Sequence, residues 1–399
     1  MLTCVFTGVA SGLPLFVLFQ LVPAWLKDGG VSLVDIGLFA LVGFPYTWKF
    51  IWSPLMDRWY PPFLGRRRGW MLITQVALVL AIGGMGMLDP VQSTHLVAAL
   101  AATVAFFSAS QDIVIDAFRR EILLNDEELG MGNGIHVSAY RISSLVPGSL
   151  ALILADVYPW PVVFWVTGAF MAVGVVMTLL VAEPETDLPP RAGLRQSIVE
   201  PFAEYLARKG WSSLLLVLCF MVLYKLGDNM ATALSTPFYL DIGFTKTEIG
   251  LVAKHAALWP AIIGGILGGI MTVRVGLNRA LWLFGVVQLV SILGFALLAR
   301  SEPELWLLAA VIAFEYTGVG MGTAAFTAYI ARETSRTFAA TQFALFTALA
   351  ALPRTLANAS TGLIVEEVGW YAFFVLCALL AVPGMLLLLW VAPWGRRDH

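Results

Sequence analysis

The sequence has few charged side chains, few histidines and only three cysteines, and each of these scarcities excludes a class of protein. Asp, Glu, Lys and Arg make up 13% of its 399 residues, against about 25% in a soluble domain. A chain with so little charge cannot cover itself with a polar surface, so lipid must cover it. The formal net charge of −2, without a basic tail, gives no reason to expect a nucleic-acid partner.

Motifs of enzymes and metalloproteins are also missing. The sequence has no HExxH or GxSxG pattern and no Cys/His spacing typical of a metal site. Cys4, Cys219 and Cys377 each lie in an apolar run, which predicts buried, reduced thiols and no disulfide framework. We therefore expect neither an enzyme nor a bound metal or organic cofactor.

Long apolar runs are what the sequence has in abundance, since 59% of its residues are hydrophobic. A helix that crosses the bilayer needs about 20 predominantly apolar residues. The runs predict an all-α membrane protein with twelve transmembrane helices. These helices are expected at 3–26, 33–54, 70–88, 95–118, 133–155, 161–182, 212–239, 247–271, 280–299, 306–330, 340–364 and 370–391.

The short polar breaks between the runs alternate in charge. Every second break, together with the central one and the C-terminal end, is rich in Arg and Lys, sixteen in all. The other breaks contain only Lys27, Lys246 and Arg300. Because positively charged loops stay in the cytoplasm, this difference predicts that both termini are cytoplasmic.

The longest break, 183–211, follows the sixth predicted helix. It contains three prolines and then an amphipathic stretch with Ile198, Phe202 and Leu206 on one face. This pattern is typical of a cytoplasmic linker that lies on the membrane surface. The predicted parts of the chain are an N-terminal six-helix bundle at 1–182, the linker at 183–211 and a C-terminal six-helix bundle at 212–399.

A short pattern occurs in both halves. Segment 28–40 and segment 241–253 match at eight positions in identity or chemical type, at an offset of 213. Two parallel six-helix repeats are the architecture of major facilitator transporters, whose substrate site is expected between the halves near mid-membrane. In each segment a Ser or Thr precedes an acid by three residues, which is the spacing of a capping box. Asp35 and Glu248 are therefore expected as helix caps, with a role as proton sites as the alternative.

A basic cluster follows the second predicted helix. Asp57 and Arg58 are separated by six residues from the run 65–69, Gly-Arg-Arg-Arg-Gly. This resembles the D-R-x-G-R-R/K motif of the major facilitator superfamily, with a longer gap. An acid that pairs with a guanidinium could latch the outward-facing state, whereas plain orientation charge is the alternative. We expect Asp57, Arg58 and Arg119 to form the latch and Arg66 to Arg68 to act mainly as orientation charges.

The fourth predicted helix has the most concentrated polar signal. Ser108, Asp112 and Asp116 are spaced i, i+4 and i+8, which places them on one helix face, with Gln111 beside it. An ionisable group in lipid costs about 2.5–3.5 kcal/mol, so these acids must face a cavity or a partner. Two acids one turn apart repel each other, which predicts a coupled pair that exchanges a proton. The alternative is structural pairing with the nearby arginines Arg119, Arg120 and Arg141.

Basic and aromatic side chains inside other predicted helices suit an anionic substrate that contains sugar. Lys225 and Asp228 are spaced i, i+3, so they either contact the substrate or neutralise each other. The predicted substrate-binding residues are Tyr46, Lys49, Ser108, Gln111, Tyr140, Arg141, Tyr224, Lys225, Asp228, Lys254, Glu315 and Arg354.

With these residues in place, the chain resembles the AmpG-type muropeptide permeases of the major facilitator superfamily. The resemblance rests on segments 8–14, 36–43, 49–54 and 63–70, and above all on Ser110–Arg119, Ser-Gln-Asp-Ile-Val-Ile-Asp-Ala-Phe-Arg. It implies a monomer in the bacterial inner membrane. Such a permease imports N-acetylglucosaminyl-1,6-anhydro-N-acetylmuramyl peptides from periplasm to cytoplasm, driven by protons. Transport of another anionic solute, such as an acyl-CoA, a siderophore or a peptide, remains the alternative.

Overall fold

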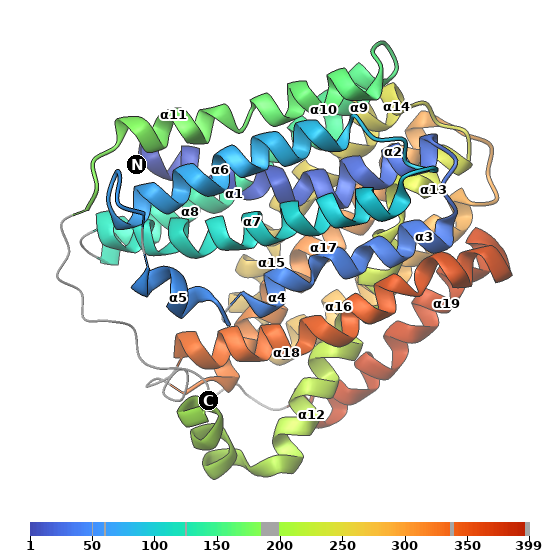
Figure 1. Ribbon diagram of the computed structural model, residues 1–399. Helices are drawn as coiled ribbons and strands as arrows, with labels where there is room; N and C mark the ends of the chain where they lie inside the picture. The colour runs from blue at the N-terminus through green and yellow to red at the C-terminus, as the bar shows by residue number, and fades with distance from the viewer. Residues whose placement is uncertain (50, 60, 124–125, 185–198, 336–338, 396–399) are drawn as a thin grey trace. The chain divides into compact units, whose positions relative to one another are not determined.

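The computed structural model describes residues 1–399 except 50, 60, 124–125, 185–198, 336–338 and 396–399 (Figure 1). Every regular element within the described residues is a helix, which confirms the all-α prediction. In the first half these are α1 (Leu2–Phe16), α2 (Val22–Asp28), α3 (Leu33–Leu38), α4 (Phe44–Trp48), α5 (Ser53–Arg58), α6 (Arg66–Met85), α7 (Thr94–Ile122), α8 (Asp126–Ser143), α9 (Ala151–Ala155), α10 (Trp160–Ala169) and α11 (Ala172–Leu180). In the second half they are α12 (Glu200–Ala233), α13 (Ser235–Asp241), α14 (Lys246–Glu248), α15 (Lys254–Val275), α16 (Leu277–Leu298), α17 (Leu305–Glu333), α18 (Ala339–Ala359) and α19 (Thr361–Val391).

Ten helical segments in the described part of the chain are long and apolar enough to cross a membrane. They are Leu2–Asp28, Arg66–Met85, Thr94–Ile122, Met131–Ala155, Trp160–Leu180, Glu200–Ala233, Lys246–Val275, Leu277–Leu298, Leu305–Glu333 and Thr361–Val391. They coincide with ten of the predicted spans. The shorter apolar segment Leu33–Trp48 lies at the second predicted span, and α18 lies at the eleventh.

Several spans are interrupted by local changes of helix type. One-turn π-helices occupy Val17–Leu21, Val146–Leu150 and Ile249–Ala253. Pro23 follows the first of them and Pro147 lies in the second. Because proline has no backbone N–H, the regular α-helical hydrogen bonds cannot continue through it, and a wider turn accommodates the loss.

A glycine kinks each of two long helices, α12 and α19. Gly210 in α12 and Gly369 in α19 both have a φ of 77°, a left-handed conformation that glycine adopts without steric cost. Gly210 separates the amphipathic stretch from the seventh predicted span. Gly369 separates the end of the eleventh predicted span from the start of the twelfth.

The chain folds into two compact units. Unit 1 comprises Met1–Ser32, Leu41–Arg191 and Thr245–Lys254, and unit 2 comprises Leu33–Ala40, Ala192–Phe244 and His255–His399. Each unit therefore includes one short segment from the other half of the sequence. We call Leu33–Ala40 and Thr245–Lys254 the exchanged segments, and they lie within the repeated sequence pattern. The predicted boundaries, 1–182, 183–211 and 212–399, do not include this exchange.

The exchanged segment in unit 1 is held by a capping box and by two acids. The Thr245 side chain accepts a hydrogen bond from the Glu248 backbone N–H, and the Glu248 carboxylate accepts one from the Thr245 N–H. The cap role predicted for Glu248 is thus confirmed. Lys246 Nζ lies 3.0 Å from Asp28 Oδ1, and the Thr247 N–H donates to Asp156 at 2.7 Å.

The exchanged segment in unit 2 is held by close backbone contact. Gly37 lies against Gly362. A Cβ added to Gly362 would be 1.8 Å from the Leu33 carbonyl oxygen. Only a residue without a side chain permits this approach. The Val34 N–H also donates to Glu366 Oε1 at 3.3 Å.

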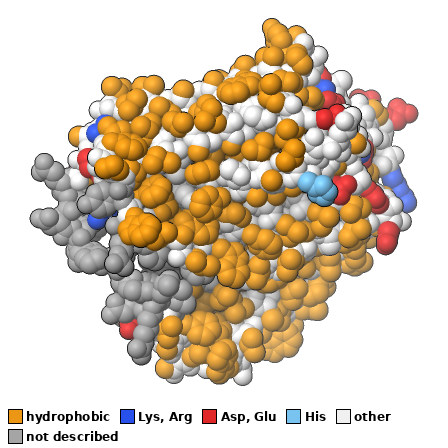
Figure 2. Space-filling model, in the orientation of Figure 1, with side chains coloured by type: hydrophobic (Ala, Val, Ile, Leu, Met, Phe, Trp, Pro, Cys, Tyr) orange, Lys and Arg blue, Asp and Glu red, His pale blue; other side chains and the backbone are white. Residues whose placement is uncertain are grey.

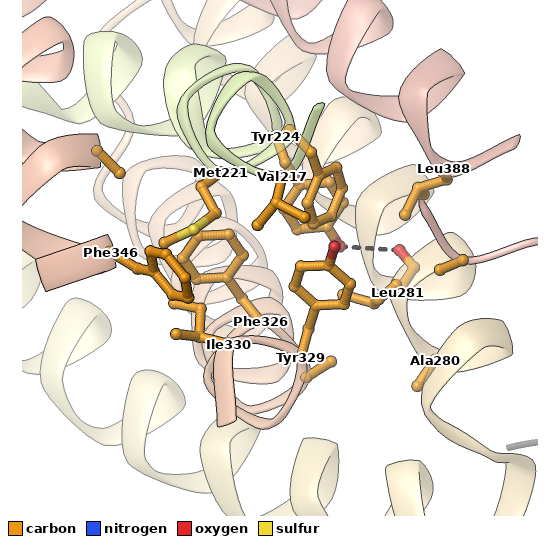
Figure 3. Packing of buried hydrophobic residues seen from close by; sticks show 14 of the residues in the cluster. Val217, Met221, Tyr224, Ala280, Leu281, Phe326, Tyr329, Ile330, Phe346 and Leu388 are labelled. Atoms are coloured by element: carbon orange, nitrogen blue, oxygen red, sulfur yellow. Dashed lines mark hydrogen bonds between the residues drawn. The ribbon is translucent and has the colours of Figure 1, made fainter. Parts of the chain in front are cut away.

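Within unit 1, α1 lies against α8 and α6 lies against α7 (Figure 1). Within unit 2, α12, α16, α17, α18 and α19 share a hydrophobic cluster (Figure 3). The cluster includes Tyr205 of the amphipathic stretch, whose ring centroid lies 4.9 Å from that of Phe346. Phe202 and Leu206 also pack against it. This apolar face therefore contacts protein through Phe202 and Leu206, and Ile198 is outside the described residues.

Hydrophobic side chains cover most of the surface visible in Figure 2, while charged side chains gather near the helix ends. Leu180 and Val273, for example, are 80% and 86% exposed. Such a surface suits contact with lipid. The three cysteines are free thiols, as predicted, but only Cys4 and Cys377 are buried, because Cys219 lies on the exposed side of α12.

A glycine in α19 tests the contact between α12 and α19. A Cβ at Gly384 would lie 2.5 Å from the Tyr224 backbone nitrogen, so Gly384→Ala should force the helices apart and destabilise the fold by about 1–3 kcal/mol. Gly269→Ala is the control, since a Cβ there meets no atom within 4 Å. We expect thermal unfolding in detergent to occur at a lower temperature for Gly384→Ala only. Equal melting temperatures would contradict the close contact.

Candidate functional site

The Asp112 carboxylate, on α7 in unit 1, has both a hydrogen-bond donor and a nearby cation. The Ser11 hydroxyl donates to Asp112 Oδ1 at 2.5 Å, and Lys49 Nζ lies 3.8 Å from Oδ2. The Asp112 side chain is 15% exposed, whereas Lys49 is 34% exposed. Three segments far apart in the sequence thus converge on one acid.

Asp116, one turn further along α7, has a different environment. Its side chain is 53% exposed, and its Oδ1 lies 3.1 Å from Arg119 Nη2. Arg119 also donates from Nε to Asn133 Oδ1 at 2.9 Å. Asp116 thus pairs with an arginine, which was the alternative to proton exchange. The two acids of the predicted pair are therefore not equivalent.

Buried polar side chains surround Asp112. Ser108 and Gln111 are fully buried on α7, and the Gln111 amide donates to the Ala10 carbonyl at 2.6 Å. The Gln111 Oε1 has no hydrogen-bond partner among the described residues, and the Ser108 and Tyr46 hydroxyls face each other. Because buried polar groups are almost always paired, the unpaired Gln111 Oε1 indicates a place for a ligand or water.

Two further predicted residues lie on α8. The Tyr140 ring packs on Phe16, with centroids 5.4 Å apart. Arg141 is half-buried, and no carboxylate of the described residues pairs with it. Lys254 ends the exchanged segment of unit 1 and lies beside Gly148.

The polar groups of unit 2 centre on α12 and α17. Lys225 Nζ lies 2.6 Å from Asp228 Oδ2, and both side chains are buried, so the two residues neutralise each other. Glu315 is fully buried and its Oε2 is hydrogen-bonded to Ser291. Arg354, on α18, donates from Nε to the Ala350 carbonyl at 3.0 Å.

Tyr224 belongs to the core rather than to this polar group. Its hydroxyl donates to the Leu281 carbonyl at 2.8 Å, and its ring stacks on Phe326 (Figure 3). Only 4% of the residue is exposed. We therefore assign Tyr224 to packing instead of substrate binding.

The basic cluster after α5 contains an ion pair that sequence reasoning missed. Arg67 Nη2 lies 2.6 Å from Glu121 Oε1, and their side chains are only 5% and 3% exposed. Arg66 pairs with the same carboxylate at 3.1 Å, and Arg68 donates to the Thr178 carbonyl at 2.8 Å. These contacts give the three arginines a structural role beside the orientation role predicted for them. The side chains of Asp57 and Arg58, the predicted latch, are outside the described residues.

A related contact occurs in unit 2 at the same place in the repeat. Arg332 donates to Asn278 Oδ1 at 2.8 Å. Asn278 follows Arg67 by 211 positions, and Arg332 follows Glu121 by the same number. This spacing is two residues shorter than the offset of 213 between segments 28–40 and 241–253, so the repeat alone would not have predicted the Arg67–Glu121 pair.

Comparison with known proteins decides the family. A model described as Major Facilitator Superfamily matches residues 4–358. The anhydromuropeptide permease of Escherichia coli (strain K12) is 43% identical over 385 residues, which cover 96% of this chain and 77% of that protein. The chain belongs to the AmpG-type permeases of the Major Facilitator Superfamily. It is therefore a multi-pass membrane transporter and not an enzyme.

Other relatives agree with this family. The putative transporter AmpG 4 of Rickettsia felis is 30% identical over 394 residues, covering 96% of this chain and 94% of that protein. Among solved structures, the nucleoside transporter NupG has a TM-score of 0.76 over 98% of each chain, at 12% identity. That likeness concerns the fold alone. It confirms the predicted major facilitator fold for this AmpG-type permease.

Removing one partner of the buried ion pair should destabilise the permease. In Arg67→Ala the buried Glu121 carboxylate keeps only the partly exposed Arg66 as an ion-pair partner. We expect this loss to lower the free energy of unfolding by about 3–5 kcal/mol. We expect a lower melting temperature in detergent. The exposed Arg120→Ala is the control, and Arg67→Met with Glu121→Leu should recover most of the loss. An Arg67→Ala protein as stable as Arg120→Ala would contradict the structural role.

Proposed function

We propose that this permease imports N-acetylglucosaminyl-1,6-anhydro-N-acetylmuramyl peptides from periplasm to cytoplasm by alternating access, together with protons. The protein would act as a monomer in the bacterial inner membrane with both termini in the cytoplasm. The observation that carries the proposal is the 43% identity to the anhydromuropeptide permease along 96% of this chain. The excess of Arg and Lys in alternate loops supports the orientation.

The side chains of the candidate site suit this substrate. An anhydromuropeptide has two sugars and several carboxylates. The Arg141 guanidinium has no carboxylate partner among the described residues, and it can bind a carboxylate through two parallel hydrogen bonds. The buried Gln111 Oε1 can accept a hydrogen bond from a sugar hydroxyl, and the Tyr46 and Ser108 hydroxyls, which face each other, can each donate and accept.

The contacts of Asp112 suggest how a proton is coupled to the substrate. While it is ionised, Asp112 attracts Lys49 across 3.8 Å. A proton on Asp112 cancels that attraction, so the ammonium group becomes available to a carboxylate of the substrate. We therefore assign proton coupling in unit 1 to Asp112 and a pairing role with Arg119 to Asp116.

Uptake by the purified protein in proteoliposomes tests the function. Labelled anhydromuropeptide should accumulate when the outside is more acidic than the lumen, and only equilibrate without a pH gradient. An acyl-CoA added in excess should not compete. Absence of uptake under both conditions, by folded protein in the correct orientation, would reject the proposal, and competition by the acyl-CoA would favour another anionic substrate.

Replacing Asp112 with Asn separates coupling from binding. We expect Asp112→Asn to lose gradient-driven accumulation but to retain exchange of labelled for unlabelled substrate, because Asn imitates the protonated acid. Asp89→Asn, in a loop where the side chain accepts from the Val91 and Gln92 N–H groups, is the control. Loss of exchange from normally folded Asp112→Asn would indicate a binding or structural role instead.

Replacing Arg141 with Ala tests recognition of the substrate carboxylate. We expect the half-saturation concentration for uptake to rise about tenfold or more, since a charge-assisted hydrogen bond contributes about 1.5–3 kcal/mol. The maximal rate should change less. Arg120→Ala serves as the control because Arg120 is exposed at the end of α7. An unchanged half-saturation concentration would exclude Arg141 from the site.

A further inference from the structure

Glu315 is the most deeply buried acid among the described residues whose charge has no counter-ion. It lies in the middle of α17 and is 0% exposed. Its Oε2 is hydrogen-bonded to the Ser291 hydroxyl of α16, and the side chain next to the rest of its carboxyl group is another acid, Asp228, which offers no donor while it is ionised. An ionised carboxylate in such a place would lack most of the donors that it needs.

The hydrogen bonds of Ser291 bear on the protonation of Glu315. The Ser291 hydroxyl has one hydrogen, and both the Gln288 carbonyl, at 2.9 Å, and the Glu315 carboxyl group are placed to accept it. Since a carbonyl and an ionised carboxylate are both acceptors, one hydrogen cannot satisfy both. A protonated Glu315 that donates to the Ser291 oxygen satisfies both contacts.

The cations nearest to Glu315 contact other groups. Within bonding distance, Lys225 is paired with Asp228 at 2.6 Å, and both are buried. Arg354 acts electrostatically on Asp228 and donates to a backbone carbonyl. The described cations near this group are thus directed at Asp228. Among the described residues no cation lies within ion-pair distance of Glu315 itself, and a neutral Glu315 avoids the cost of burying a charge that nothing contacts.

The groups facing Glu315 come from several helices of unit 2. Those that interact with it electrostatically are Lys225 and Asp228 of α12, Tyr239 of α13, Tyr316 of α17 and Cys377 of α19. Lys225 is the cation among them. It could therefore compensate Glu315 when that acid ionises.

We propose that Glu315 holds an exchangeable proton and carries it during transport, which makes it a proton-coupling residue of unit 2. The inference rests on the proposed function for its coupling role. In the discharge step the O–H bond of Glu315 breaks and the proton passes to water on the cytoplasmic side. The Ser291 hydrogen then turns from the Gln288 carbonyl to the Glu315 carboxylate, and Lys225 is shared between two acids. Reloading from periplasmic water reverses each change.

Infrared spectroscopy tests the exchangeable proton without any substrate. The C=O stretch of a protonated carboxyl should be present in the wild-type protein and should disappear reversibly as the pH is raised. Glu315→Gln should lack this titrating band. Glu333→Gln is the matched control on the same helix, since Glu333 already has Lys209 at 2.6 Å and Tyr205 as partners. Because Asp112 also exchanges a proton in the proposed function, the proteins compared all carry Asp112→Asn, and a titrating band that Glu315→Gln retains in that background would overturn the proposal.

Proton counting in proteoliposomes tests the coupling role. With an entrapped pH indicator, Glu315→Gln should take up one proton fewer per muropeptide than the wild type, with a smaller accumulation ratio and unimpaired exchange. Glu333→Gln should match the wild type. An unchanged proton count, or loss of exchange in folded Glu315→Gln protein, would overturn the carrying role. If the wild-type protein moves no muropeptide, the proposed function fails, while the infrared result still decides whether Glu315 holds the proton.

Discussion

A charged side chain inside this protein needs a counter-ion or a hydrogen-bond partner. The arrangement of the polar side chains follows from that constraint. Lipid offers neither hydrogen bonds nor counter-ions. Lys225 therefore forms an ion pair with Asp228, and Arg67 forms one with Glu121. The nitrogen–oxygen distance is 2.6 Å in both pairs. Arg141 has no carboxylate partner among the described residues, and in the proposed function a carboxylate of the substrate pairs with it.

The polar groups in the two units are arranged differently, although the halves of the sequence share a repeated pattern. In unit 1 the central acid has a hydroxyl donor and a lysine that is one-third exposed. In unit 2 the Lys225–Asp228 ion pair is buried. A further buried acid, Glu315, has no cation within ion-pair distance among the described residues. Polar contacts at the helix ends are shared more evenly, because Arg67 with Glu121 and Asn278 with Arg332 occupy matching positions. Specialisation is therefore concentrated in the middle of the spans.

Much of the fold could be predicted from the sequence because apolar length and loop charge are local properties. The helix positions, the Thr245–Glu248 capping box and the family all depend on residues close together in the chain. Tyr224 and Glu121 could not be assigned, because their roles depend on which helix faces them. Spacing places Tyr224 on a face of α12, but only tertiary contacts show that this face meets Leu281 and not solvent. Asp112 and Asp116 likewise share a helix face, yet differ in exposure because of their neighbours.

The exchanged segments bear on how the polypeptide matures. Leu33–Ala40 folds with residues from the second half of the chain, and Thr245–Lys254 with residues from the first. A nascent chain released after its sixth span would hold an incomplete unit 1, because the ten residues that finish it have yet to be synthesised. Cutting the polypeptide within 183–211 would likewise give two fragments that each contain a piece of the other's fold. Biogenesis is therefore completed only when the late segment has left the ribosome and reached its place beside Asp28 and Asp156.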